Sequence, residues 1–203
     1  EFEDDQAGRA LVAIARRDGS NPYMAAAVLS SAVPHYKALV AAAGDLSEAL
    51  VIGLMKMSIN DPQAAGKMTK SLLAGRKGEV KWRMLAEAPS AWRRHVGSLA
   101  LEAAADETKS DTERVAAMDL LGKAGIDLAM KLLSAQHSLQ LQAAAIRLLG
   151  RINEEKRMMD QWQYLGPAGR NAVEEVLLSR EGSVDQLLSG LEAGKIQPSE
   201  ISA

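Results

Sequence analysis

The sequence predicts an all-α protein, an α-solenoid built from stacked helical hairpins. Apolar residues recur at helical spacing along most of the 203 residues. Hydrophobic residues make up 47% of the chain but aromatic residues only 3%, so the apolar mass is aliphatic and favours helices. One phrase, RVAAMDLLGKAG from Arg114, also returns as QAAAIRLLGRIN from Gln142. A single hairpin cannot bury its apolar face, whereas equivalent hairpins bury each other's faces by stacking.

The N-terminal part of the chain begins with an amphipathic helix and a clear turn. In AGRALVAIARRD, the residues Leu11, Ile14 and Ala15 share one helical face. The turn GSNP follows, in which Asn21 is the predicted N-cap and Pro22 the first residue of the next helix.

Further helices are expected up to about Leu73. Pro34 ends one helix and starts another. Asp45 and Glu48 have the spacing of a capping box before ALVIGLMKM, and the NDP at 60–62 starts a further helix.

The helical pattern weakens over 74–90, which contains two glycines, a proline and a run of basic residues. We therefore divide one continuous solenoid into N-terminal repeats at 1–75, a basic and less regular connecting segment with a helix at 76–110, and C-terminal repeats at 111–203.

Capping signals mark the helices of the C-terminal part. Ser110 and Glu113 form a predicted capping box, and Ser183 and Gln186 have the same spacing. Asn153 is the expected N-cap of the helix that includes EEKRMMD.

The repeated phrase has a period of about 28 to 29 residues, which holds two helices and is typical of a short HEAT-like unit. We expect six or seven hairpins or partial hairpins. The equivalent positions are Leu120-Leu121, Leu148-Leu149 and Leu177-Leu178, and the second interval between them is slightly longer than the first.

Catalytic and cofactor motifs are not evident in this sequence. The chain has no cysteine, so it offers no thiolate ligand and no CxxCH, and it contains no glycine-rich phosphate loop. His35, His95 and His137 have no metal-ligand partner one helical turn ahead. Acidic doublets lie near predicted helix starts or on polar faces, where solvation explains them. We predict no catalytic residue, cofactor site or metal site.

Basic residues gather between Lys67 and Arg94, although the whole chain has a net charge of −2. Eight basic and two acidic residues give this segment a net charge of +6. An acidic protein could bind here, and interleaved tryptophans would also suit nucleic acid, although they could equally anchor the core. The candidate residues for an anionic partner are Arg76, Lys77, Lys81, Trp82, Arg83, Trp92, Arg93 and Arg94.

Three stretches resemble a known family: LVAIARRDGSNPYMAAAVLSSA from Leu11, WQYLGPAGRNAVEEVLLSR from Trp162, and LLSGLEAGKIQPSEIS from Leu187. They resemble the helical-repeat region of large exported proteins of the membrane-bound dehydrogenase, haem-binding type, found in planctomycetes and their relatives. The part from about Ala43 to Ser110 matches loosely. Asn-Pro-Tyr stands at 21–23 where Asp-Pro-Trp is common in that family.

The resemblance implies a HEAT-like spacer. In that family the repeats lie between a β-propeller that resembles sugar dehydrogenases and a c-type cytochrome, so any haem c would be bound elsewhere in a longer chain. The sequence begins at Glu1-Phe2 without methionine, and we expect it to be a part of such a protein. The expected location is the periplasm or cell envelope, and the expected partners are neighbouring domains or another protein, with no membrane insertion by this part. The alternative is a free-standing module that binds an acidic protein or nucleic acid through 67–94.

Overall fold

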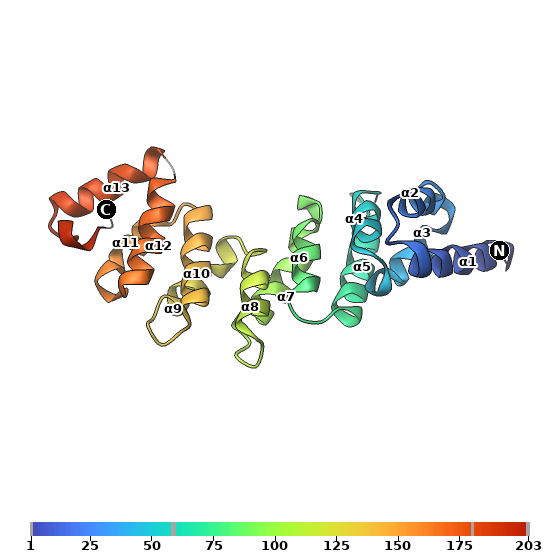
Figure 1. Ribbon diagram of the computed structural model, residues 1–203, viewed down its shortest axis with the longest axis horizontal. Coiled ribbons are helices and arrows are strands. Elements are labelled where there is room, and N and C mark those ends of the chain that lie inside the picture. Colours follow the sequence, from blue (N-terminus) through green and yellow to red (C-terminus); the bar gives the residue numbers. More distant parts are fainter. Residues whose placement is uncertain (1, 58–59, 180, 202–203) are drawn as a thin grey trace. The chain divides into compact units, whose positions relative to one another are not determined.

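The computed structural model describes residues 2–57, 60–179 and 181–201, and every regular element in these ranges is a helix (Figure 1). The all-α prediction is therefore confirmed. Internal packing divides the chain into two compact units, unit 1 at Glu1–Leu99 and unit 2 at Ala100–Ala203. The boundary lies inside the predicted connecting segment 76–110.

Alternate helices of unit 1 pack in two rows. One row joins α1 to α3 and α3 to α5, and the other joins α2 to α4 and α4 to α6. Sequential neighbours also pack, as α1 does on α2. The elements are α1 (Phe2–Asp18), α2 (Pro22–Ser30), α3 (Ala32–Ala41), the 3-10 turn η1 (Ala43–Asp45), α4 (Glu48–Met57), α5 (Pro62–Gly75), α6 (Val80–Ala86), the 3-10 turn η2 (Ser90–Trp92) and the first part of α7 (Arg93–Ala105).

The cap predicted for α2 is correct, and the cap predicted for α4 is wrong. The Asn21 side chain accepts hydrogen bonds from the backbone of α2, and Asp61 does the same for α5. At α4 the hydroxyl of Ser47 accepts from the Leu50 N–H at 3.5 Å. Asp45, which we expected in this role, lies in η1 and forms a 2.9 Å ion pair with Arg16.

The core of unit 1 is largely aliphatic, with two tryptophans from the basic part of the sequence between Lys67 and Arg94. Its most fully buried large side chains come from α3 to η2. They are Leu39, Leu46, Leu50, Leu54, Met55, Met68, Leu72, Trp82, Met84, Leu85 and Trp92.

In unit 2, α10 packs between α8 and α12 in one row, and α9, α11 and α13 pack alongside them (Figure 1). The short helices α9 and α11 connect successive members of the main row. The elements after α7 are α8 (Asp111–Met118), η3 (Lys123–Gly125), α9 (Ile126–Leu132), α10 (Leu139–Arg151), α11 (Glu155–Asp160), η4 (Trp162–Tyr164), α12 (Pro167–Leu178), α13 (Glu181–Glu192) and η5 (Pro198–Glu200).

The helices α8, α10 and α12 each make the same kind of polar contact. In each helix, the side chain four residues after the N-cap donates a hydrogen bond to a backbone carbonyl of the preceding segment. Arg114 donates through Nε to the Ala104 carbonyl at 3.0 Å. Gln142, one period later in the sequence, donates to the His137 carbonyl at 2.8 Å. Arg170, a further period along the chain, donates to the Trp162 carbonyl at 3.2 Å. Each side chain thus ties the start of its helix to the segment before it.

The buried leucines follow the same interval. Leu121, Leu149 and Leu177 are all buried, and they follow one another at equal spacing in the sequence. Leu178, which we predicted to be part of the third equivalent pair, is 55% exposed. We expected a longer interval between the second and third leucine pairs than between the first and second. That expectation is wrong, because the buried leucines of this unit are equally spaced.

Two predicted caps of unit 2 have other roles. Asn153 has φ of +61° and follows α10 as a left-handed C-terminal residue. The N–H groups of Asn153 and Glu154 donate to the carbonyls of Gly150 and Leu149, which is a Schellman motif. Ser183 is buried inside α13, and its hydroxyl lies 3.3 Å from Glu155 Oε1. The Ser110 cap is confirmed, because its hydroxyl accepts from the Glu113 N–H.

Polar contacts between successive hairpins join residues about one period apart in both units. The Ser47 hydroxyl donates to the Gly19 carbonyl, 28 residues earlier, at 2.6 Å. Arg76 donates to the Leu46 carbonyl, and Arg151 donates to the Leu121 carbonyl, each 30 residues earlier. The same arrangement, a side chain of one hairpin bonded to a turn carbonyl of the preceding one, therefore occurs in both units.

A polar clamp holds the last described segment of unit 2. Glu200 accepts from the Trp162 indole N–H at 3.1 Å and forms an ion pair with Arg170. The Arg170 guanidinium also lies 5.9 Å from the centroid of the Trp162 ring. Trp162 and Arg170 belong to the resembling stretch that starts at Trp162, and Glu200 belongs to the one that starts at Leu187. Two of the three resembling stretches are therefore in contact.

The clamp lowers the pKa of Glu200 below its ordinary value. The largest cause is the backbone N–H of Gln197, which donates to Glu200 Oε2 at 3.0 Å. The Trp162 indole and the Arg170 charge act in the same direction. The ionised carboxylate is thus the form that the folded chain stabilises.

We predict that Ala144→Gly destabilises unit 2 more than Ala143→Gly does. Both substitutions lie in α10 and cost about 1 kcal/mol in helix propensity. Ala144 is buried and Ala143 is half-buried, so Ala144→Gly loses a larger share of the roughly 0.8 kcal/mol that a fully buried methyl group contributes. Urea unfolding monitored by circular dichroism measures both, and equal losses would mean that Ala144 does not pack as described.

We predict that Glu200→Gln has a lower melting temperature than the wild type at pH 7. The gap between the two melting temperatures should become smaller at acidic pH. Because folding lowers the pKa of Glu200, the stabilisation is complete above the ordinary value of 4.5 and is lost as the pH falls through the lowered value. Thermal unfolding between neutral and strongly acidic pH measures this. The exposed Glu192→Gln is the control, and a difference for Glu200→Gln that stays constant with pH would contradict the clamp.

Candidate binding surface of the basic segment

The basic segment 67–94 runs from the second half of α5, through a turn and α6, to η2 and the first residues of α7. Gly78 lies in the turn with φ of +59°, a conformation that glycine adopts without strain. The segment is therefore helical for most of its length, including α6 where the sequence pattern was weak.

Both tryptophans of the segment lie in the core. Trp82 is 2% exposed and Trp92 is 1% exposed. The indole Nε1 of Trp92 has no hydrogen-bond partner among the described residues. Their rings are covered by protein, so they are not available to stack on bases. The core-anchor alternative fits these two positions, and the structure corrects their place among the candidate contacts.

Arg76 supports the fold of unit 1. Its Nη2 donates to the Leu46 carbonyl that follows η1, and its Nε is buried. This contact gives Arg76, which is half-buried, a structural role within unit 1.

Three other predicted cations face solvent to different degrees. Lys77 and Arg83 are exposed. Lys81 is half-buried, and its Nζ lies 5.7 Å from the centroid of the Trp82 ring. Arg93 and Arg94 begin α7, but their side chains lie outside the described part of the structure.

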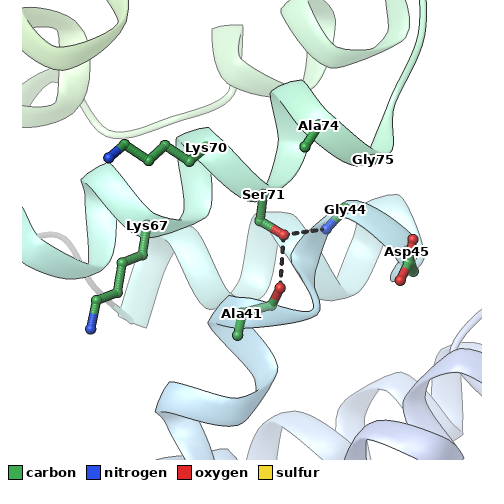
Figure 2. A pocket seen from close by; sticks show the side chains of 8 residues that line it. All are labelled: Ala41, Gly44, Asp45, Lys67, Lys70, Ser71, Ala74 and Gly75. Atoms are coloured by element: carbon green, nitrogen blue, oxygen red, sulfur yellow. Dashed lines mark hydrogen bonds between the residues drawn. The ribbon is translucent and has the colours of Figure 1, made fainter.

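The structure adds two lysines that we did not include among the candidate residues. Lys67 and Lys70 project from one side of α5, at the edge of a depression next to η1 (Figure 2). Their spacing of three residues on a helix predicts a shared face. The sequence does not reveal the depression, because its other wall is formed by α3 and η1, which come much earlier in the chain.

Several exposed cations of the segment have no ion pair in the part of the chain that the structure describes. Within the described residues, Lys67, Lys70, Lys77 and Arg83 form no ion pair. Some cations elsewhere pair with nearby carboxylates, as Lys109 does with Asp106 and Glu113, while others such as Lys37 and Lys123 are exposed without an ion pair among the described residues. A group of exposed unpaired cations leaves a positive surface that an anionic partner could neutralise.

The described residues contain no group of three or more His, Asp or Glu side chains able to hold a metal ion. The acidic doublets that could have supplied paired carboxylates are Asp4-Asp5, Glu154-Glu155 and Glu174-Glu175, and the second of these has other contacts. Glu154 pairs with Arg157 at 2.9 Å, and Glu155 lies against the Ser183 hydroxyl. Glu174 is buried, while the side chains of Asp4 and Asp5 are outside the described part.

None of the helices in 2–57, 60–179 and 181–201 combines the length and apolar character needed to cross a membrane. Comparison of the chain with protein-family models, curated proteins and solved structures finds no match.

Proposed function

We propose that the chain is a non-catalytic α-solenoid of HEAT-like hairpins that acts as a scaffold for other domains or proteins. The observation that carries this proposal is the one-period separation of the contacts between hairpins, as in Arg76 to Leu46 and Arg151 to Leu121. Such contacts are expected when each structural repeat packs only on its neighbours. Repeats of this kind form extended surfaces that hold partners at fixed distances.

We further propose that the scaffold belongs to a larger exported redox protein, as a spacer between a dehydrogenase-like domain and a c-type cytochrome. This step rests on the family resemblance. The clamp of Trp162, Arg170 and Glu200 supports it, because it gives a structural reason for two of the resembling stretches to occur together. A stiff spacer suits electron transfer, which depends on the distance between cofactors.

The absorption spectrum of the full-length gene product tests the redox proposal. The protein should be expressed in a host that matures c-type cytochromes and measured oxidised and then reduced. Sharp haem bands in the reduced spectrum are the expected result. A colourless full-length product would remove the electron-transfer context and leave the scaffold alone.

A second candidate function is the capture of an acidic protein or nucleic acid by the basic segment. It is favoured by the exposed cations that lack ion pairs, among them Lys77 and Arg83. Electrostatic contacts of this kind weaken as salt screens them, over a Debye length of about 10 Å at 0.1 M.

We predict that the chain binds immobilised polyglutamate at about 20 mM NaCl and elutes by about 200 mM, because salt screens these contacts. Lys77→Glu combined with Arg83→Glu should elute at lower salt. The control is Lys123→Glu with Lys156→Glu, two exposed cations of unit 2. Equal retention of both variants would show that the basic segment is not the site.

A further inference from the structure

A shallow depression beside α5 carries two of the exposed cations of unit 1. It is lined by α5 on one side and by the end of α3 with η1 on the other, and its volume is about 590 Å³ (Figure 2), within the roughly 300–1,000 Å³ usual for binding sites. Lys67 and Lys70 lie at its edge, and both are exposed.

Close backbone packing shapes the floor of this depression. A Cβ atom at Gly75 would lie 2.6 Å from Gly44 Cα, so α5 and η1 meet with no side chain between them. The Ser71 hydroxyl donates to the Ala41 carbonyl at 2.9 Å and accepts from the Gly44 N–H at 3.0 Å (Figure 2). Because these polar groups satisfy one another, the lysines supply the charge that an incoming ligand would meet.

The charges around the depression favour a carboxylate-bearing peptide over nucleic acid. Asp45 lines the depression away from the two lysines (Figure 2). It forms a 2.9 Å ion pair with Arg16. A uniformly charged phosphate backbone would meet this carboxylate, whereas a peptide can place acidic residues only at the lysines. Base stacking has no partner here, because Trp82 and Trp92 are buried.

We propose that this depression docks a short acidic segment of a partner protein, whose carboxylates pair with Lys67 and Lys70 while its chain lies over the floor beside Ala74. The proposal rests on the second candidate function and deepens it, since it assigns the site and the class of partner.

Fluorescence anisotropy with a labelled peptide of alternating Glu and Ala tests the proposal on the whole chain, using a peptide of about 12 residues at about 20 mM NaCl. Lys67→Glu with Lys70→Glu should raise Kd by about tenfold or more, because it replaces two attractions with repulsions. Ala74→Trp should weaken binding without a change of charge, because it fills the depression. The control is Lys37→Glu with Lys56→Glu, which reverses two exposed cations of unit 1 that do not line the depression. It should raise Kd less than the double substitution at Lys67 and Lys70 does.

The melting temperature of every variant is first compared with that of the wild type. A variant that unfolds at the wild-type temperature and binds more weakly then reports on the site and not on the stability of the fold. If Lys77→Glu with Arg83→Glu weakened peptide binding while the Lys67 and Lys70 variant and Ala74→Trp did not, the depression would be ruled out as the site. The rest of the basic segment would then be the binding region. Absence of peptide binding at low salt would overturn both. Tighter binding of an oligothymidylate of equal charge would overturn the acidic-protein assignment in favour of nucleic acid.

Discussion

The structure of each unit depends on how the ends of its helices are satisfied. A helix leaves carbonyls without partners at its C-terminus, and burying them unpaired is costly. Here a neighbouring hairpin often provides the donor: Ser71 for Ala41, Arg76 for Leu46 and Arg151 for Leu121. Hydrophobic packing joins the helices, but these bonds also fix the register between hairpins, because each donor reaches one turn of the preceding hairpin.

The clamp at the end of unit 2 is a variation on the same constraint. There the donor Arg170 lies on α12, while the acceptor Glu200 comes 30 residues later in the chain. Ile196 is buried in the same segment, and a Cβ atom at Gly190 would lie 2.9 Å from its Cδ1 atom. The segment that contains Ile196 and Glu200 therefore packs on α12 and α13 through an apolar contact and a charged one.

The sequence was sufficient for the all-α class and for caps whose donors and acceptors are close in the chain, such as Asn21 and Ser110. It misled at Asn153, because asparagine suits both an N-cap and a left-handed C-terminal residue. Which of the two occurs depends on where the preceding helix ends. Local pattern was equally unable to reveal the depression at Lys67 and Lys70, since its walls come from helices far apart in sequence.

The candidate site shows that a count of basic residues in a segment does not reveal which of them are exposed to a partner. The basic segment contains one arginine used for packing, Arg76, and two tryptophans used as core anchors. The burial of the two tryptophans weakens the nucleic-acid alternative, while the exposed cations on which the acidic-protein alternative rests remain. Lys67, Lys70 and Lys77 are exposed without ion pairs among the described residues, so a partner can reach them without breaking an existing pair. A partner that supplies carboxylates would therefore meet charges that the fold itself leaves unused.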